Sequence, residues 1–201
     1  VATAVLKGTE VVHRAQHGFM SVESRESLRE DAIFRMYSNT KLVTSVAMMM
    51  LCEAGKTELD QPLAEILPKF RDMSVLKGDA QSGADTQALA TPITIRHLLS
   101  HTAGLSYGFI EPSSVIDTVY AQARMNPLHR RDTTLEALCD ELAALPLAYQ
   151  PGTRWRYSLA TDVCARVIEV VSGMRFDAYL HEHIFAPLGM VDTDFWVPAD
   201  K

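Results

Sequence analysis

The stretch that decides the fold is SNTKLVTSVAMMMLCEAG, residues 38–55. Ser38 and Lys41 stand three positions apart at its head, and residues at that spacing share one face of a helix, with about 5–6 Å between their Cβ atoms. Residues 42–52 are apolar nearly all round, which predicts a buried core helix that ends at Gly55. The run is too short to span a membrane.

The spacing of Ser38 and Lys41 predicts a nucleophile beside its activating group. A serine hydroxyl is a weak nucleophile without such a neighbour. Burial at the start of the helix disfavours the ammonium form of Lys41, so its amine can accept or relay the hydroxyl proton. Two alternatives stay open: Ser38 as a helix N-cap, and Lys41 as a surface lysine whose stem covers apolar side chains. A second S-x-x-K match, Ser74 to Lys77, has no apolar run behind it and is interpreted as coincidence.

Length and composition narrow the possible classes of protein. The chain has 201 residues, 47% of them hydrophobic, which is enough for a substantial core and for one or two domains. Its net charge of −6 and its lack of a basic stripe argue against nucleic-acid binding. We recognise neither a signal peptide nor a transmembrane segment, so we expect no membrane association and a cytoplasmic location. Because the chain starts at Val1, an upstream segment remains open.

The metal-binding and redox residues predict structural roles. Cys52, Cys139 and Cys164 are widely spaced and fall in apolar helical patterns, which predicts buried free thiols rather than disulfides or a zinc site. His97 and His101 lie four positions apart, as a helical metal pair does. No third ligand accompanies them in the pattern, so we expect no metal.

Short elements account for most of the rest. Strand candidates at 2–6 and 11–15 flank a turn at 7–10 and predict a hairpin. Helices are predicted at 63–67, from the Thr94 cap through 99, at 135–144 behind a capping box at 133–136, at 162–171 and at 176–185. Residues 77–91 are predicted to form a mobile loop, and residues 155–157 a short extended piece.

Tyr157 is a candidate partner for the serine and the lysine. It follows a Pro151-Gly152 turn and comes just before a predicted helix. A phenol becomes a useful base if a nearby ammonium, such as that of Lys41, lowers its pKa. The alternative is a packing tyrosine beside Trp155, with its hydroxyl satisfied. Residue patterns alone do not bring positions 38 and 157 together.

Five segments in order resemble the serine β-lactamase-like superfamily, and most closely its class C β-lactamase and family VIII carboxylesterase branch. They are FRMYSNTK (34–41), GKTELDQPL (55–63), IRHLLSHTAGL (95–105), PGTRWRYSL (151–159) and PLGM (187–190). The resemblance implies an α+β fold of the β-lactamase and transpeptidase type. In it, an antiparallel sheet entered by the 1–16 hairpin packs on the Ser38 helix and on the 162–172 helix. We expect an α/β subdomain of residues 1–56 and 157–201 and a mainly helical subdomain of residues 57–156, with Ser38 between them.

The resemblance also implies the chemistry. Ser38 would be the acylated nucleophile, and Lys41 with Tyr157 the base and proton relay. The Ser38 backbone N–H would form one arm of the oxyanion hole. The substrate would be a short-chain carboxylic ester that acylates Ser38, releases its alcohol and is then hydrolysed by water. The resemblance thus implies a serine carboxylesterase of class EC 3.1.1, with no metal or organic cofactor.

Two departures from the family pattern refine this expectation. Leu159 stands where β-lactamases of this class usually carry Asn, which favours an esterase over a β-lactamase. Leu159, Trp155 and Tyr107 are the candidates to line an acyl or alcohol pocket. The family's third motif, a Lys-Thr-Gly-like or Trp-Gly-Gly-like strand, is missing. We therefore expect that a remaining C-terminal part of the same enzyme is needed for activity and stability.

Other functions fit parts of the pattern. A β-lactamase or a D-alanyl-D-alanine peptidase of the same fold would keep the same residues, and so would a catalytically inactive binding relative. The segment GLSYG, residues 104–108, matches the G-x-S-x-G elbow of α/β-hydrolases, with Ser106 as nucleophile and Asp177 with His181 or His183 as partners. That elbow needs a buried strand before its serine, whereas a helix is predicted there.

Overall fold

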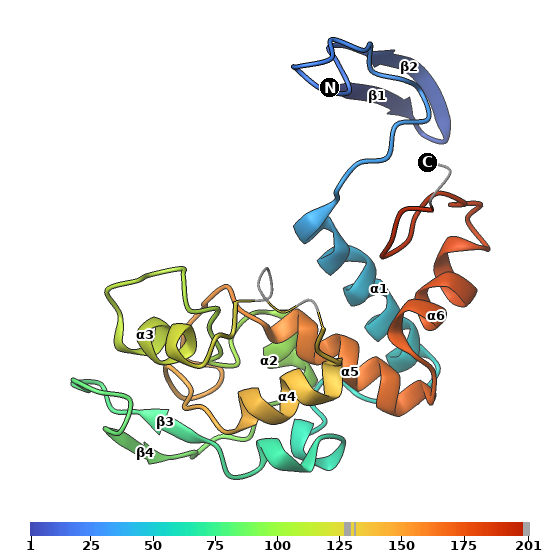
Figure 1. The fold of residues 1–201 in the computed structure, drawn as a ribbon. Coiled ribbons are helices and arrows are strands. Elements are labelled where there is room, and N and C mark those ends of the chain that lie inside the picture. Colours follow the sequence, from blue (N-terminus) through green and yellow to red (C-terminus); the bar gives the residue numbers. More distant parts are fainter. Residues whose placement is uncertain (127–129, 131, 199–201) are drawn as a thin grey trace. The chain divides into compact units, whose positions relative to one another are not determined.

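The computed structural model describes residues 1–126, 130 and 132–198, and Figure 1 shows their path. The chain forms two compact units, one of Val1–Tyr37 with the residues from Asp194 onward, and one of Ser38–Thr193. The boundary falls between Tyr37 and Ser38, so the predicted site residues all belong to the second unit. The predicted subdomains, 1–56 with 157–201 and 57–156, stay a prediction, as does the packing of the 1–16 hairpin on the helices.

The first unit holds the predicted hairpin. Strand β1 (Ala2–Lys7) pairs antiparallel with β2 (Glu10–Gln16), and the tight turn between them contains Gly8 with a φ of 63°. Only glycine adopts such a left-handed conformation without a steric penalty from a Cβ atom. The register shifts between Val5 and Leu6, which pair with His13 and Val11, so β2 contains one extra residue as a bulge.

The second unit is mainly helical (Figure 1). Its elements are the 3-10 turn η1 (Tyr37–Asn39) at its entrance, α1 (Thr40–Glu53), the 3-10 turns η2 (Leu63–Glu65) and η3 (Pro68–Phe70), α2 (Ile95–Leu99), α3 (Val115–Gln122), α4 (Leu135–Ala143), α5 (Ala160–Ser172), α6 (Phe176–Leu180) and the π-helical turn η5 (His181–Phe185). A short hairpin of β3 (Ser74–Leu76) and β4 (Thr86–Ala88) completes the described elements. The helices predicted at 94–99, 135–144 and 162–171 are confirmed, and the one predicted at 176–185 is present as α6 and the π-helical turn η5. The helix predicted at 63–67 is only the 3-10 turn η2, and α3 was not predicted.

Helix α5 forms the centre of this unit, because α1, α2, α4 and α6 all pack against it. Six of its residues are buried, at the three- and four-residue spacing of one helical face: Ala160, Val163, Cys164, Ala165, Val167 and Ile168. Gly173 ends the helix with a left-handed φ of 73°, as the sequence predicted. The apolar stripe of α5 is therefore what holds the surrounding helices together.

Helix α1 is buried along one face rather than all round, which corrects the prediction. Thr44, Ala47, Met48 and Leu51 are buried, whereas Leu42 on the opposite face is 72% exposed. The reason is that α5 and α6 pack on α1 through the buried face. An apolar sequence shows which residues can be buried, but the neighbouring elements decide which of them are.

The predicted loop at 77–91 contains a strand, which is a second correction. Strand β4 pairs with β3 in this region. The carboxylate of Asp85 accepts hydrogen bonds from the backbone N–H groups of Gln81 and Ser82, and this orders the turn between the strands. Ser74 lies on β3, so the second S-x-x-K match is not on a helix.

Helix caps and thiols follow the sequence closely. Thr94 caps α2 and forms a capping box with His97, as predicted for the cap. Helix α4 is capped by Thr134, one residue later than the predicted capping box at 133–136. The three cysteines are free thiols, with Cys139 and Cys164 buried and Cys52 partly exposed. In the described part of the chain, no helix combines the length and the apolar character that crossing a membrane requires.

Truncating the core face of α5 should destabilise the protein far more than truncating its outer face. Ile168 has no exposed surface, whereas Val170 on the same helix is 42% exposed. We expect Ile168→Ala to lower the free energy of unfolding by about 2–5 kcal/mol, and Val170→Ala to change it by no more than about 0.5 kcal/mol. Denaturant titration of both variants measures this, and equal losses would contradict the central role of α5.

Candidate active site

Ser38 and Tyr157 meet in the structure although 119 positions separate them. The Ser38 Oγ and the Tyr157 phenolic oxygen lie 2.7 Å apart, at hydrogen-bonding distance. Ser38 lies in the η1 turn directly before α1 and is exposed. The N-cap of α1 is Asn39, so the alternative interpretation of Ser38 as the N-cap is wrong. Its hydroxyl is therefore exposed and oriented by a phenol.

Lys41 lies between two phenols. Its Nζ is 4.8 Å from the ring centroid of Tyr157 and 5.6 Å from that of Tyr107. It also forms hydrogen bonds with both side chains. Lys41 is half-buried in the first turn of α1, and Tyr107 is only 5% exposed. The ammonium thus has a fixed environment, unlike that of a surface lysine.

The balance of charges assigns different protonation states to these groups. Burial alone would lower the pKa of Lys41, but its hydrogen bonds and charge interactions with Tyr107 and Tyr157 outweigh burial and raise that pKa. The predicted fall in the pKa of Lys41 is therefore wrong in direction, because desolvation was considered without the phenols. Burial raises the pKa of Tyr157, but hydrogen bonds with Lys41 and Ser38 and the Lys41 charge outweigh it and lower that pKa.

The second phenol stays neutral. Burial raises the pKa of Tyr107 to about 12 despite its hydrogen bond with Lys41. Of the three groups, Tyr157 is therefore the one that loses its proton most readily, while Lys41 keeps its own. A lowered phenol pKa beside an ammonium is the electrostatic effect expected for opposite charges in contact. The arrangement can deprotonate Ser38 through Tyr157.

The segment before Tyr157 has no regular secondary structure but is held by backbone hydrogen bonds. The Gly152 N–H donates to the Thr102 carbonyl at 2.9 Å, and the Arg156 N–H donates to the His101 carbonyl at 2.8 Å. Gly152 has a φ of 83°, and a Cβ there would lie 3.0 Å from the His97 Nε2 atom. The turn before Tyr157 thus packs directly on α2 and on the loop after it, and α5 starts three residues after the phenol.

Aromatic rings surround Tyr157. The Tyr107 and Tyr157 ring centroids are 5.4 Å apart, Trp155 stacks on Tyr157 at 6.4 Å, and Phe109 stacks on Tyr107 at 5.2 Å. Trp155 is 67% exposed and offers apolar surface next to the phenol. Leu159, which we expected to line a pocket, has no exposed surface and belongs to the core. That expectation is wrong for the Leu159 side chain, because it turns inward where α5 begins.

The two histidines of the sequence pattern have structural partners. His97 Nδ1 accepts a hydrogen bond from the Thr94 N–H in the capping box. His101 packs on Tyr157 with 5.0 Å between ring centroids, and its Nδ1 lies 3.3 Å from the Ser158 Oγ. Burial, together with the charge of Lys41, lowers the pKa of His101 and keeps its imidazole neutral. Over the described ranges of the chain, no group of three or more His, Cys, Asp or Glu side chains is placed to hold a metal ion.

One acidic group near the site, Asp162, was not predicted from the sequence. Asp162 lies in the first turn of α5, where acidic residues are common and therefore carry little signal. Burial raises its pKa, and the positive charge of Lys41 opposes that effect. Asp162 thus contributes to the electrostatic environment of Lys41.

The elbow serine of the alternative interpretation is not exposed. Ser106 has no exposed surface and is hydrogen-bonded to Asp117 and Arg156. Helix α2, rather than a strand, precedes it, which fails the requirement of the elbow motif. Asp177, its proposed acidic partner, is engaged by Arg175 on the neighbouring turn. The geometry therefore does not favour an α/β-hydrolase site.

Comparisons with known proteins agree with the geometry. A family model described as Beta-lactamase matches residues 1–201. Esterase EstB of Burkholderia gladioli is 33% identical over 192 residues, which cover 95% of this chain and 45% of that protein. Lovastatin esterase of Penicillium rubens is 34% identical over 179 residues, which cover 88% and 43% of the two chains.

The fold is also similar to that of a solved structure. The protein described as EstCE1, a hydrolase with promiscuous acyltransferase activity, superposes with a TM-score of 0.79 at 29% identity. The match covers 94% of this chain and 46% of that one. The chain spans about half the length of the curated relatives it matches.

Removing the Lys41 ammonium should raise the pKa of Tyr157 toward the ordinary tyrosine value of about 10. The reason is that Lys41 supplies both a hydrogen bond and the nearby positive charge that lower this pKa. NMR titration of tyrosines labelled at Cζ measures the pKa of Tyr157 in the Lys41→Ala variant. The Tyr157 signal is assigned by its loss in the Tyr157→Phe variant. The matched control is Lys69→Ala, whose ammonium pairs with Asp140 on the surface. An unchanged Tyr157 titration in Lys41→Ala would contradict the assigned cause.

Proposed function

The chain belongs to the β-lactamase family, and from this membership we propose that the protein is a serine hydrolase of short-chain carboxylic esters that works through an acyl-Ser38 intermediate. Its fold is of the β-lactamase and transpeptidase type, as predicted. The observation that carries the proposal is the 2.7 Å contact between the Ser38 hydroxyl and Tyr157. Lys41, hydrogen-bonded to Tyr157, supplies the positive charge that this pair requires.

In the proposed acylation step, Tyr157 as phenolate accepts the Ser38 hydroxyl proton. The Oγ atom attacks the ester carbonyl carbon, and the Ser38 backbone N–H donates to the oxyanion that forms. As the carbon–oxygen bond to the alcohol breaks, Tyr157 returns its proton to the leaving oxygen. The Lys41 ammonium stabilises the phenolate throughout, which is the electrostatic preorganisation that gives enzymes much of their rate.

Deacylation repeats these roles with water. Tyr157 takes a proton from a water molecule, which attacks the acyl carbon, and Ser38 leaves as the free hydroxyl when the proton returns to Oγ. The products are a carboxylic acid and an alcohol. Tyr157 can act as the base in both half-reactions, on Ser38 and then on water, because it gives up the proton and returns to the phenolate at the end of each.

Esters are favoured over β-lactams by two observations. No amide is available to a β-lactam at position 159, because the residue there is a leucine whose side chain is buried in the core. Two relatives at 33% and 34% identity are named as esterases. Hydrolysis of β-lactams and D-alanyl-D-alanine peptides are the competing proposals, and rates on the three substrate classes separate them.

Acyl transfer is a second candidate, supported by the neighbour described as a hydrolase with promiscuous acyltransferase activity. In that reaction an alcohol replaces water as the acceptor of the acyl group from Ser38. Product analysis with an added primary alcohol distinguishes the two, since transfer yields a new ester and hydrolysis yields only the acid.

The proposed activity is assigned to the protein in which these residues occur, because the matched relatives are about twice as long. We propose that residues outside the present 201 complete the active enzyme. The measurements below therefore use the protein at its full natural length.

Ser38 should be the residue that a serine-directed phosphonate labels. We expect one adduct on the Ser38 peptide by mass analysis. Ser38→Ala should remove the adduct and lower hydrolysis of a short-chain nitrophenyl ester by on the order of a thousandfold or more. Ser74→Ala is the matched control, because Ser74 has the same S-x-x-K spacing but lies on β3.

Each other outcome of the labelling has a definite meaning. An adduct on Ser106 would replace the proposal with the elbow mechanism. A folded protein without any serine adduct would identify a catalytically inactive binding relative.

Acylation should speed up as the pH rises through the lowered pKa of Tyr157. A general base acts when deprotonated, so activity is lost as the pH falls below that pKa. Tyr157→Phe should slow acylation by about 100- to 10,000-fold and abolish this dependence. The rate of nitrophenol release in the pre-steady state, followed from pH 6 to 10, measures the pH dependence of acylation.

Tyr149→Phe is the control for this measurement, because the Tyr149 hydroxyl is buried and has no hydrogen-bond partner among the described residues. An unaltered pH profile in Tyr157→Phe would exclude Tyr157 as the base.

A further inference from the structure

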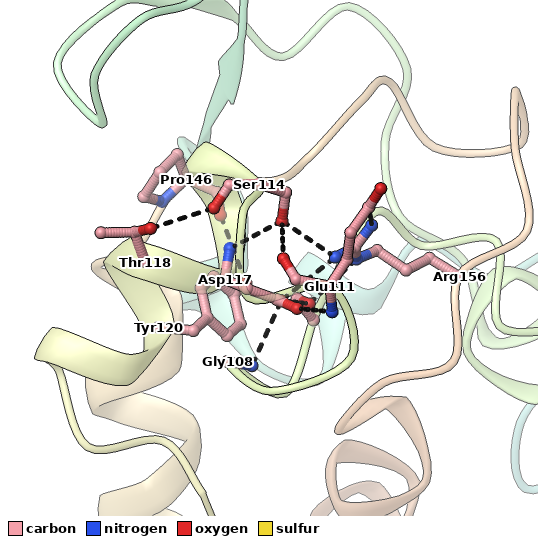
Figure 2. A network of polar contacts seen from close by, with 9 residues as sticks. Gly108, Glu111, Ser114, Asp117, Thr118, Tyr120, Pro146 and Arg156 are labelled. Carbon is pink, nitrogen blue, oxygen red and sulfur yellow. Dashed lines mark hydrogen bonds and ion pairs between the residues drawn. The ribbon is translucent and has the colours of Figure 1, made fainter.

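A cluster of polar groups surrounds the buried carboxylate of Asp117 (Figure 2). We call it the Asp117 cluster, and it consists of Ser106, Gly108, Glu111, Ser114, Asp117 and Arg156. Asp117, on α3, has no exposed surface, and the Arg156 side chain is 13% exposed. Figure 2 shows the loop residues and Arg156 converging on Asp117. Nothing in the proposed chemistry uses these groups directly.

The Asp117 carboxylate is fully engaged. Oδ1 accepts hydrogen bonds from the Ser106 hydroxyl and, at 3.3 Å, from the Gly108 N–H. Oδ2 accepts from the Glu111 N–H, and an Arg156 guanidinium nitrogen lies 3.1 Å from Oδ1. Burial alone would raise the pKa of Asp117, but these partners outweigh burial and keep it ionised. A buried charge requires such complete pairing, because an unpaired one costs several kcal/mol.

The partners of Asp117 are the chain neighbours of the two phenols. Ser106 and Gly108 flank Tyr107 on either side, and Arg156 directly precedes Tyr157. Arg156 Nε also donates to the Ser106 Oγ at 2.9 Å, which joins the two segments directly. The backbone adds a parallel tie, since the Leu159 N–H donates to the Ser106 carbonyl at 3.4 Å.

The loop of the cluster has little room to move. Gly108 has a φ of 91°, and a Cβ there would lie 2.8 Å from the backbone nitrogen of Ala121 on α3. Ser114 caps α3 and also accepts a hydrogen bond from Arg156 at 3.3 Å. Arg156 further pairs with Glu111 at 3.1 Å. The loop is therefore held against α3 at one end and against Arg156 at the other.

We propose that the Asp117 cluster holds Tyr107 and Tyr157 at the spacing at which both phenols contact Lys41, so that Ser106, Asp117 and Arg156 are positioning residues for the acylation of Ser38. This inference rests on the proposed function. It also assigns a role to the serine of the GLSYG segment, which ties the cluster together and performs no chemistry. The planar guanidinium of Arg156 suits this role, because its fork reaches Ser106, Asp117 and Glu111 at once.

Small displacements of the phenols should be costly. A misplacement of about 1 Å in a reacting group can slow a reaction about a hundredfold. The Lys41 Nζ is 4.8 Å from one ring centroid and 5.6 Å from the other, so movement of either phenol changes its contact with the ammonium. Loosening the cluster should therefore alter the ionisation of Tyr157 as well as the rate.

The first test removes one hydroxyl. Ser106→Ala deletes the hydroxyl that donates to Asp117 and accepts from Arg156, and it leaves the direct Asp117–Arg156 ion pair in place. We expect acylation of Ser38 to slow about 10- to 100-fold. The rising limb of the pH profile should move upward, toward the ordinary tyrosine pKa of about 10. The NMR titration of Tyr157 should move in the same direction, without any substrate.

A second variant covers the case in which the first one unfolds. Arg156→Lys keeps a positive charge beside Asp117 but lacks the Nε donor to Ser106. We expect the same upward shift of the Tyr157 titration. Leu142→Ala is the control for lost stability, because Leu142 is a fully buried core residue of α4 outside the cluster. It should lower stability and leave the Tyr157 titration unchanged.

The outcomes separate this inference from the proposed function. If Ser106→Ala and Arg156→Lys lower stability but leave the Tyr157 titration and the pH profile unchanged, the cluster is merely structural and the inference fails. If the unaltered protein never acylates Ser38, the proposed function fails. Even then, the NMR titration still reports whether the cluster positions Tyr157 beside Lys41.

Discussion

The packing of α1 against α5 is the interaction on which the site depends. Ser38 lies two residues before the start of α1, and Tyr157 lies three residues before the start of α5. When the apolar faces of the two helices meet, the segments at their N-terminal ends come together, and Ser38 reaches Tyr157 at 2.7 Å. Burial of apolar surface, which is not directional, thus produces a directional contact, because each polar group is tied to a helix end.

The electrostatics of the site follow from one ammonium between two unlike phenols. The two phenols raise the pKa of Lys41 against the effect of burial, and Lys41 in turn lowers the pKa of Tyr157. Burial keeps the pKa of Tyr107 at about 12, so this phenol contributes hydrogen bonding without charge. The same amino-acid type therefore has two roles, and burial rather than residue identity decides between them. In the proposed mechanism, this division lets Tyr157 rather than a histidine act as the base for Ser38.

The Asp117 cluster complements the apolar core. Helix packing sets the approach of α1 and α5, but it leaves the irregular segments around Tyr107 and Tyr157 without regular backbone pairing. These two segments are instead connected by polar groups, namely a buried carboxylate and a guanidinium that each bind several partners. A buried ion pair is a weak source of stability compared with apolar packing. Its directional bonds are suited to holding two loops in register.

Features that depend on neighbouring residues were determined by the sequence alone. These are the hairpin with Gly8 in its turn, the Thr94 cap, the Gly173 helix end and the placement of Ser38 and Lys41 one turn apart, since each rests on contacts within a few positions. Resemblance to a family added the predicted role of Tyr157 as part of the base and proton relay. The tertiary structure decided the one-sided burial of α1, the burial of Leu159, the rise in the pKa of Lys41 and the Asp117 cluster. These depend on which distant segments become neighbours, and packing over the whole chain sets that outcome.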